Sequence, residues 1–233
     1  MDMRELIYVK KGVLSKEQCN SLINEYEQRA SEAELEKCYH AVTNKMTTST
    51  YKRIELTPET ENFNLIHNTI NQTIKDWMVY LDSFTSFHTA ALKKSLRYSH
   101  MHRLMKYSEG EWIHPHVDWE EMIHGSCTVA LNDDYEGGDF CFWNGKHTVK
   151  LEAGDVMIFP AGPMWVHEVM PITKGIRYST NTFLQSLPLE ERNRVGEMIW
   201  AIGHSANIKN AYFYDQCLED LGDEGILFSA YNS

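Results

Sequence analysis

The chain has 233 residues, of which 42% are hydrophobic and 24% are charged, and its mean hydropathy is -0.45. This composition is that of an ordinary soluble globular protein, and it excludes a disordered, a collagen-like or a membrane-spanning chain. The formal net charge of -11 disfavours a general affinity for nucleic acid or for anionic membranes. Five cysteines without a C-x-x-C pair, and first residues that lack an apolar leader, predict a reducing, cytoplasmic setting.

The first residues predict a short strand followed by a helix. We expect the strand over residues 5–9, where apolar residues dominate. Ser15, with Gln18 three residues later, has the pattern of a helix N-cap. An apolar stripe then supports the helix, formed by Leu14, Cys19, Leu22, Ile23 and Tyr26.

A second helix is predicted to open at Thr57-Pro58, because proline is favoured in the first turn of a helix. Its apolar residues recur at spacings of three and four, at Phe63, Ile66, Ile70, Ile74, Trp77 and Leu81. The polar, Thr-rich residues 35–56 between the two helices predict a loop, with one strand around residues 52–56.

From Arg97 onward the pattern changes to short alternating segments between Gly, Asn and Asp residues. Asn144-Gly145 is a strong hairpin signal among them. Successive strands without intervening helices predict an antiparallel sandwich or barrel rather than a βαβ sheet. The strands are expected over residues 97–107, 114–118, 126–132, 139–143, 147–151, 155–159, 165–169 and 176–185.

After Pro188 the pattern returns to helix. We expect a helix over residues 189–202, ending at Gly203, and a weaker one near residues 207–221. The chain as a whole is predicted to be mainly β with flanking helices (α+β). Its expected parts are one domain over residues 1–188, with a β core at 97–186 and N-terminal helical support at 1–96, and a C-terminal helical extension of the same domain at 189–233.

His116 and Asp118 are the residues that first indicate chemistry. On a strand, residues two apart face the same side, so this imidazole and carboxylate would lie next to each other. Together they form two thirds of a 2-His-1-carboxylate site, which suits iron(II) because it leaves coordination positions open. Two alternatives remain at this point: His114 and His116 as the pair of ligands, or a surface pair without function.

Further short motifs accompany this pair in a fixed order along the chain. They are Tyr107 and Gly110, His116 and Asp118, Gly137-Gly138-Asp139-Phe140, Gly154-Asp155, His167-Glu168-Val169-Met170-Pro171 and Gly175-Ile176-Arg177. In these residues the chain resembles the prolyl 4-hydroxylase-like branch of the iron(II)- and 2-oxoglutarate-dependent dioxygenases. The resemblance covers about residues 97–186 and implies a double-stranded β-helix, a jelly-roll core of the cupin-like kind, with N-terminal helices packed on one sheet.

The resemblance also implies the roles of individual residues. His116, Asp118 and His167 would be the metal ligands, and Arg177 would bind the far carboxylate of 2-oxoglutarate, as a buried guanidinium suits a carboxylate better than Lys does. Ser179 and Tyr107 would be additional co-substrate contacts. The chain departs from some relatives at Ala130, where they place a tyrosine that binds the co-substrate.

The implied reaction uses iron(II), 2-oxoglutarate and O2, with ascorbate as a possible reductant. It couples the decarboxylation of 2-oxoglutarate, to succinate and carbon dioxide, with hydroxylation of an unactivated C–H bond. A prolyl residue in a peptide or protein is the first expected substrate, and a free amino acid or small metabolite is the alternative. The rival from another class is a non-enzymatic metal- or sugar-binding jelly roll, and the oligomeric state stays open.

A nucleic-acid demethylase with the same core would need a basic groove. The candidate residues are Lys93, Lys94, Arg97, Arg103 and Lys106. At a net charge of -11 we expect them to form a solvated surface instead, without a nucleic-acid partner. Of the tryptophans near the predicted site, Trp112 and Trp119 are expected to touch substrate, and Trp143 and Trp165 to belong to the core.

Overall fold

The computed structural model describes residues 2–43, 45–84, 88–118, 122–188, 190–191 and 194–195. The chain divides into two compact units, Met1–Ser186 and Leu187–Ser233. The helices and strands described below all belong to the first unit. The expected helices after Pro188 lie almost entirely outside the described residues.

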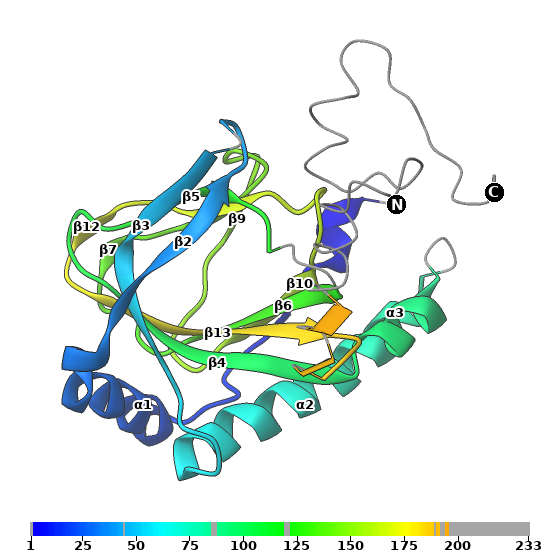
Figure 1. The fold of residues 1–233 in the computed structure, drawn as a ribbon, viewed down its shortest axis with the longest axis horizontal. Helices are drawn as coiled ribbons and strands as arrows, with labels where there is room; N and C mark the ends of the chain where they lie inside the picture. Colours follow the sequence, from blue (N-terminus) through cyan, green and yellow to red (C-terminus); the bar gives the residue numbers. More distant parts are fainter. Residues whose placement is uncertain are drawn as a thin grey trace. The chain divides into compact units, whose positions relative to one another are not determined.

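Three α-helices lie along one face of the larger sheet (Figure 1): α1 (Lys16–Gln28), α2 (Glu61–Leu81) and α3 (Thr89–Ser95). Ser15 and Gln18 form the predicted capping box of α1, each side chain bonding the other's backbone N–H. Helix α2 begins later than predicted, because the hydroxyl of Thr60 accepts the Phe63 N–H at 3.2 Å and caps the helix there. Helix α3 was not predicted. Within the described residues, no helix combines the length and the apolar character needed to cross a membrane.

The strands form sheets of seven, four and two strands, in the orders β1-β10-β6-β13-β4-β3-β2, β5-β11-β8-β9 and β12-β7. Every pairing between the described strands is antiparallel. This confirms the predicted antiparallel β core with flanking helices. The strands are β1 (Tyr8–Lys10), β2 (Glu34–His40), β3 (Lys45–Glu55), β4 (Tyr98–Tyr107), β5 (Ile113–His116), β6 (Ile123–Ala130), β7 (Glu136–Gly137), β8 (Phe140–Phe142), β9 (His147–Val149), β10 (Val156–Pro160), β11 (His167–Val169), β12 (Ile172–Lys174) and β13 (Arg177–Gln185).

Two predictions for the first 60 residues were wrong. Residues 3–6 form a 3-10 helix that Asp2 caps, so the first strand begins only at Tyr8. Residues 35–56, predicted as a loop with one strand around 52–56, contain the hairpin of β2 and β3, so the strand was predicted too short and β2 was missed; the hairpin extends the seven-stranded sheet. The hairpin shows little alternation of apolar and polar residues, because some of its interior positions are polar; Ser49 of β3, for example, is buried.

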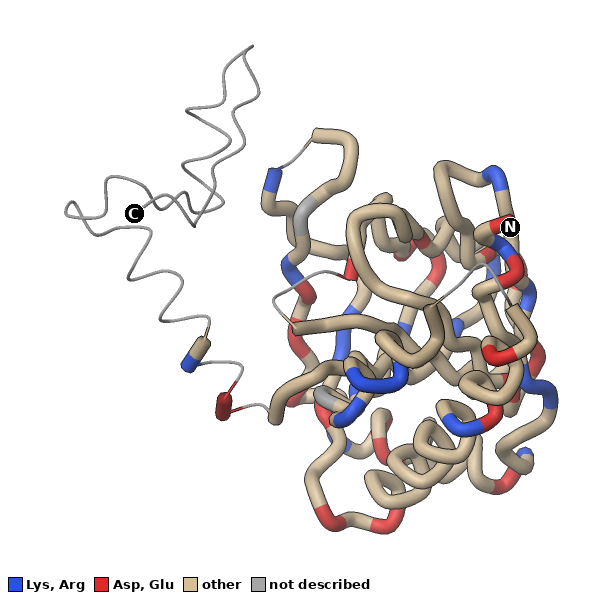
Figure 2. The backbone as a smooth tube through the Cα atoms, turned by 90° about the vertical axis from the view of Figure 1, so that its right-hand side faces the viewer, with Lys and Arg blue, Asp and Glu red and all other residues tan. Residues whose placement is uncertain are grey.

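One hydrophobic core joins the helices to the seven-stranded sheet. Trp77 of α2 is fully buried, and its indole N–H donates to the Leu6 carbonyl oxygen at 3.1 Å. Asp155 ties the same region together: Oδ1 accepts the Gly12 N–H and Oδ2 lies 2.7 Å from Lys11 Nζ. The Gly154-Asp155 motif is therefore part of the structural frame. Acidic and basic residues are interspersed along the backbone (Figure 2).

Candidate active site

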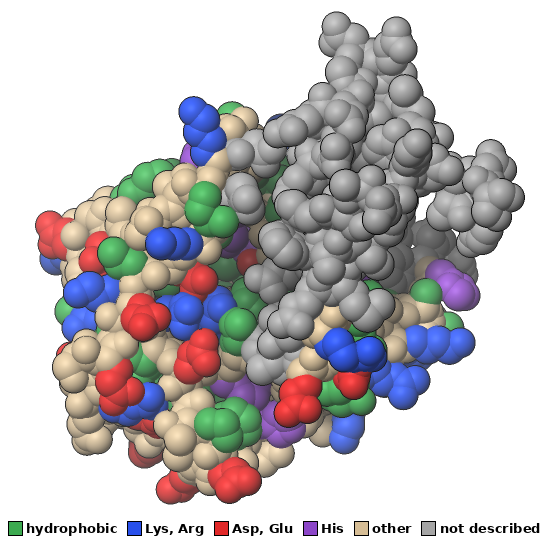
Figure 3. All heavy atoms as spheres, viewed as in Figure 1, with side chains coloured by type: hydrophobic (Ala, Val, Ile, Leu, Met, Phe, Trp, Pro, Cys, Tyr) green, Lys and Arg blue, Asp and Glu red, His purple; other side chains and the backbone are tan. Residues whose placement is uncertain are grey.

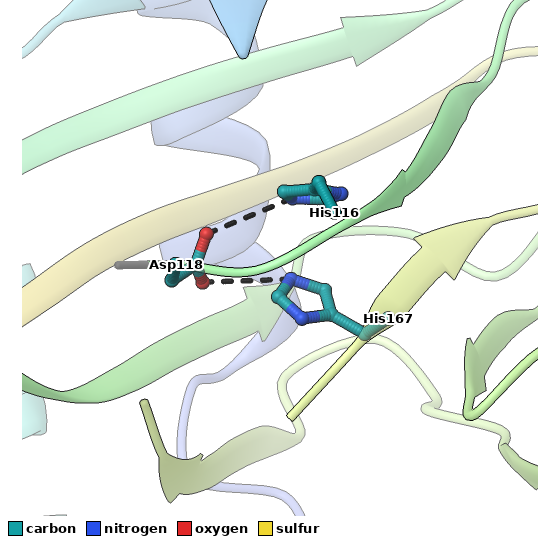
Figure 4. A group of neighbouring side chains, drawn as sticks. All are labelled: His116, Asp118 and His167. Carbon is teal, nitrogen blue, oxygen red and sulfur yellow. Dashed lines mark ion pairs between the residues drawn. The ribbon is translucent and has the colours of Figure 1, made fainter. Parts of the chain in front are cut away.

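His116 and His167 lie side by side on neighbouring strands of the four-stranded sheet. His116 ends β5 and His167 begins β11, and the two residues are directly paired across the antiparallel strands. Asp118 follows two residues after His116, beyond the end of the strand. Figure 4 shows its carboxylate facing both imidazole rings, with one oxygen atom directed to each. Strand pairing thus brings together residues that are far apart in the sequence.

The three side chains have the spacing of a metal site. His116 Nε2 lies 3.6 Å from Asp118 Oδ1, and His167 Nε2 lies 3.5 Å from Asp118 Oδ2. One ligand atom from each residue falls within 4.8 Å of the others, and no other group of three His, Cys, Asp or Glu in the described part of the chain does so. The structure therefore brings together the predicted triad.

Backbone carbonyls fix the tautomers of both rings. His116 Nδ1 lies 2.8 Å from the His114 carbonyl oxygen, and His167 Nδ1 lies 2.9 Å from the Trp165 carbonyl oxygen. Since a carbonyl oxygen only accepts, each Nδ1 carries the proton. Both Nε2 atoms then present lone pairs toward Asp118. In metal-binding histidines, a hydrogen bond from the other ring nitrogen commonly imposes this arrangement.

Burial keeps the site in the protonation state that a cation needs. All three side chains are buried, and burial, assisted by the charge of His167, lowers the pKa of His116 far below its ordinary value. Phe140 stacks on the His167 ring with centroids 5.2 Å apart. Asp118 Oδ2 is buried without a hydrogen-bond partner, a costly state that a bound cation relieves. Two imidazole nitrogens and one carboxylate fit iron(II).

Arg177 occupies the start of β13, on the facing seven-stranded sheet. Its guanidinium is buried, with the residue 3% exposed, and Nη1 donates to Ser179 Oγ at 2.9 Å. Among the described residues, no carboxylate forms an ion pair with it. Arg177 also lines a cavity of about 450 Å³, together with Ala130, Gly138 and Phe140. A buried cation without an acidic partner beside a cavity is suited to binding a guest carboxylate.

Tyr107 and Ser179 adjoin Arg177. Tyr107 of β4 is the register partner of Arg177, and the guanidinium carbon lies 5.0 Å from the centroid of its ring. Burial raises the pKa of the Tyr107 phenol, so its hydroxyl keeps its proton and can donate. Ser179 is fully buried and pairs with Ala130 of β6. The structure thus brings the three predicted co-substrate contacts together.

Comparison with known proteins shows what the β core is similar to. Residues 102–185 match the family model described as the 2OG-Fe(II) oxygenase superfamily. This segment, which is about a third of the chain, is therefore similar to that superfamily. A PKHD-type hydroxylase of Cupriavidus pinatubonensis is 36% identical over 103 residues, which are 38% of this chain and 44% of that protein. A PKHD-type hydroxylase of Acinetobacter baumannii is 38% identical over 103 residues, which again are 38% of this chain and 44% of that protein. The match therefore covers less than half the length of either relative.

Solved structures show the same fold. A Pseudomonas putida prolyl-4-hydroxylase superimposes with a TM-score of 0.58 at 17% identity, covering 78% of this chain and 94% of that one. A viral collagen prolyl hydroxylase from Paramecium Bursaria Chlorella virus-1, in a 2OG complex, gives a TM-score of 0.57 at 15% identity, covering 78% and 97%. The fold is that of the prolyl 4-hydroxylase-like oxygenases, and it confirms the predicted double-stranded β-helix.

His114 is directed to a different neighbour from His116. Its Nε2 lies 3.3 Å from Cys38 Sγ, and its ring stacks on that of His40 with centroids 4.9 Å apart. The geometry therefore favours the pair of His116 and Asp118 over the pair of His114 and His116. His102 also has a structural position, because it is buried with Nδ1 2.8 Å from Thr182 Oγ1.

Two of the described tryptophans, Trp143 and Trp165, follow their prediction as core residues. Trp165 is buried in the core, and Trp143 packs partly buried against it. Trp112 is 37% exposed, and both its backbone N–H and its carbonyl oxygen bond Thr50 Oγ1 at 2.7 Å. Its proposed contact with substrate stays a prediction. Trp119 lies outside the described residues.

The glycine pair of the sequence motif shapes the cavity beside Arg177. Both glycines have positive φ, 76° at Gly137 and 64° at Gly138. A Cβ at Gly138 would lie 2.4 Å from Ile172 Cδ1 and 3.2 Å from Arg177 Cδ. Only glycine allows the β7 segment to pass this close to the arginine.

Arg103 contradicts the prediction of a solvated basic surface. It is 7% exposed and shares one face of β4 with Tyr107, toward the interior between the sheets. Lys93 and Lys106 do lie near the surface, where they pair with Asp82 and Glu27. The available signal for Arg103 was its strand position, four residues before Tyr107, which places both side chains on one face.

Proposed function

We propose that this chain is an iron(II)- and 2-oxoglutarate-dependent dioxygenase that hydroxylates an unactivated C–H bond, with release of succinate and carbon dioxide. The observation that carries the proposal is the convergence of two imidazole lone pairs on Asp118, whose Oδ2 is buried without a hydrogen bond. Iron(II) held there would supply the redox chemistry that activates O2.

His116, Asp118 and His167 would hold the metal. Their carbonyl partners fix the two rings before any metal arrives, so little conformational entropy is lost on binding. Two neutral imidazoles and one carboxylate leave a divalent ion with a net charge of about +1. That charge attracts an anionic co-substrate, while Phe140 and Phe159 limit the entry of water around His167.

Arg177 would bind the far carboxylate of 2-oxoglutarate. Ser179 Oγ already accepts a hydrogen bond from Arg177 Nη1, so its own hydroxyl proton is free to donate to that carboxylate. Tyr107 supplies a second protonated hydroxyl from the paired strand. The small Ala130 leaves the polar contacts of this end to these three side chains.

For the substrate, a prolyl residue in a peptide or protein is the first choice. Solved proteins of the same fold carry the names prolyl-4-hydroxylase and collagen prolyl hydroxylase, and a Trichoplax adhaerens prolyl hydroxylase is in complex with a hypoxia inducible factor peptide. A free amino acid or small metabolite is the second choice. The four described cysteines are free, which supports a reducing compartment such as the cytoplasm, and ascorbate is the proposed reductant.

The test is metal-dependent formation of succinate. The protein is loaded anaerobically with iron(II) and 2-oxoglutarate and then exposed to O2, in the wild type and in the variants His116→Ala and His114→Ala. We expect the His116→Ala variant to lose metal binding and succinate formation, and the His114→Ala variant to keep both. Loss confined to His114→Ala would overturn the ligand assignment, and a wild type without succinate formation would overturn the function.

Substrate identity is tested in the same assay. Peptide and metabolite libraries are screened for stimulation of succinate release, and the products are checked for the mass gain of one oxygen atom. We expect proline-containing peptides to give the strongest stimulation. Stimulation by free amino acids alone would favour the second choice.

A further inference from the structure

Arg103 lies on the same inner face of the seven-stranded sheet as Arg177. On β13 the register pairs Arg177 with Tyr107 and Asn181 with Arg103. Because residues four apart on a strand face the same side, Arg103 lies two pleats along from the proposed co-substrate contacts. Its side chain is buried, in contact with the Phe183 ring at 4.9 Å.

A second arginine, Arg53 of β3, joins Arg103 at Glu36 of β2. Arg103 Nη1 lies 3.1 Å from Glu36 Oε2, and Arg53 Nε contacts the same oxygen atom. Arg53 Nη1 also donates to Glu55 Oε1 at 3.2 Å, and the Glu55 side chain is more than half exposed. Two guanidinium groups thus share a single oxygen atom of Glu36, whose side chain is 16% exposed.

The two arginines are poorly satisfied by this arrangement. Neither contact to Glu36 has hydrogen-bond geometry, so Glu36 Oε2, Arg53 Nε and Arg103 Nε are all buried without a hydrogen-bond partner. A guanidinium normally binds a carboxylate through two parallel hydrogen bonds. Buried donors left without acceptors cost free energy, and a second carboxylate placed against both groups removes that cost.

A short series of contacts leads from the cluster toward the proposed metal centre. Glu36 and Cys38 are two residues apart on β2, and Cys38 Sγ lies 3.3 Å from His114 Nε2, in the residue two before His116. Burial, followed by the charges of Glu36 and Asp118, raises the pKa of the Cys38 thiol, and the charge of Arg103 lowers it. Figure 3 shows basic and acidic side chains next to each other on the face crossed by β2 and β3.

We propose that Arg103 and Arg53 bind a carboxylate group of the substrate, which makes the enzyme selective for acidic substrates, and above all for peptides with Asp or Glu near the target residue. This inference rests on the proposed function, since it takes the metal centre as the place of reaction. Arg177 serves the co-substrate, and the second pair of cations serves the substrate. Glu36 holds the two guanidinium groups in place and competes with the incoming carboxylate.

The test measures binding on protein that does not turn over. The full chain is loaded with Zn(II) and saturated with 2-oxoglutarate, which occupies the Arg177 site. Two pools of capped peptides with a central proline are then offered in equilibrium dialysis, one with Asp and Glu as flanking residues and one with Asn and Gln. A third arm offers N-acetylglutamate against N-acetylglutamine. We expect the acidic pool to bind at least tenfold more tightly, with an advantage that shrinks as salt is added.

Substitutions then test whether Arg103 and Glu36 determine the preference for acidic peptides. We expect Arg103→Gln to abolish the preference, Arg103→Glu to reverse it toward peptides with basic flanks, and Glu36→Gln to strengthen binding of the acidic pool. Thermal unfolding of each variant checks the fold. If the Arg103 variants do not fold, the wild-type comparison and Glu36→Gln decide the matter.

Two results would overturn the inference: equal retention of both pools by the wild type, or an unchanged preference in a folded Arg103→Gln variant. A preference seen only in the N-acetylglutamate arm would overturn the assignment to peptides. Wild-type protein that binds neither Zn(II) nor 2-oxoglutarate contradicts the proposed function instead, so the two failures are distinguishable.

Discussion

The two sheets hold their parts of the candidate site by different means. The triad lies at the ends of the short strands β5 and β11, where carbonyl oxygens two residues before each histidine fix the rings. Arg177, Ser179 and Tyr107 lie within the long strands β13 and β4, where an extended register positions them. In the candidate metal site, the pairing of β5 with β11 brings the two histidines together and local carbonyl contacts set their rings, whereas the proposed co-substrate contacts depend on the register of the larger sheet.

The largest expected effect is that of Arg177→Gln, which should change the dependence on 2-oxoglutarate and leave metal affinity unchanged. Each charge-assisted hydrogen bond contributes about 1.5 to 3 kcal/mol, so losing two of them costs about 3 to 6 kcal/mol. That corresponds to a rise of roughly two to four decades in the 2-oxoglutarate concentration needed for succinate formation. The 2-oxoglutarate requirement of Arg177→Lys should lie between those of the wild type and Arg177→Gln, because an ammonium group keeps the charge but cannot form the bidentate pair. Metal affinity should not change, and an unaltered co-substrate dependence would remove Arg177 from the site.

A smaller effect concerns the triad alone and appears in metal-free protein. Burial holds the pKa of His116 at about 3, well below the ordinary value of 6.5. Between these two values the unfolded chain binds more protons than the folded chain, so the free energy of unfolding falls as the pH drops below 6.5. The slope is about 1.4 kcal/mol per unit, or about 2 kcal/mol between pH 6.5 and 5.

Urea unfolding of wild type and of His116→Asn measures this contribution. The variant cannot take up the proton, so its stability should decline less steeply over the same pH range. Equal slopes for the two proteins would show that His116 is not held neutral by burial. Loading with Zn(II) should stabilise the wild type and not the variant.

The smallest effect is expected from Ser179→Ala, which removes one neutral hydroxyl beside Arg177. A loss of about 1 kcal/mol raises the 2-oxoglutarate requirement roughly fivefold. Thr180→Ala is the matched control, because Thr180 is equally buried but bonds the Val129 N–H of the neighbouring strand. The control should lower stability and leave the co-substrate dependence as it is. A similar rise in both variants would mean that Ser179 acts only through packing.

The triad and Arg177 could be predicted because their positions follow from strand periodicity and from motif order. His116 and Asp118 needed only the spacing of two residues. His167 and Arg177 needed the resemblance, since no local pattern states that β5 pairs with β11. Most of the strands from 97 to 185 were predicted for a related reason, because turns and apolar alternation mark them, whereas the short strands β7 and β12 were missed.

The β2–β3 hairpin and the burial of Arg103 were missed for one common reason, although the strand position of Arg103 relative to Tyr107 was an available signal. Binary patterns assume an apolar interior, whereas here Glu36, Arg53 and Arg103 meet between the strands. A buried charged residue looks the same in sequence as a solvated one. Only the pairing of β2, β3 and β4 shows that these side chains converge.

The pairing of β1 with β10 bears on how the protein forms during its synthesis. Tyr8 is bonded opposite Ile158, so the first strand of the chain finds its partner only after most of the domain has left the ribosome. At about 5–20 residues per second, the wait is on the order of ten seconds. Until then β1 (Tyr8–Lys10) has no partner strand, and a chaperone acting on the nascent chain would protect its unpaired backbone.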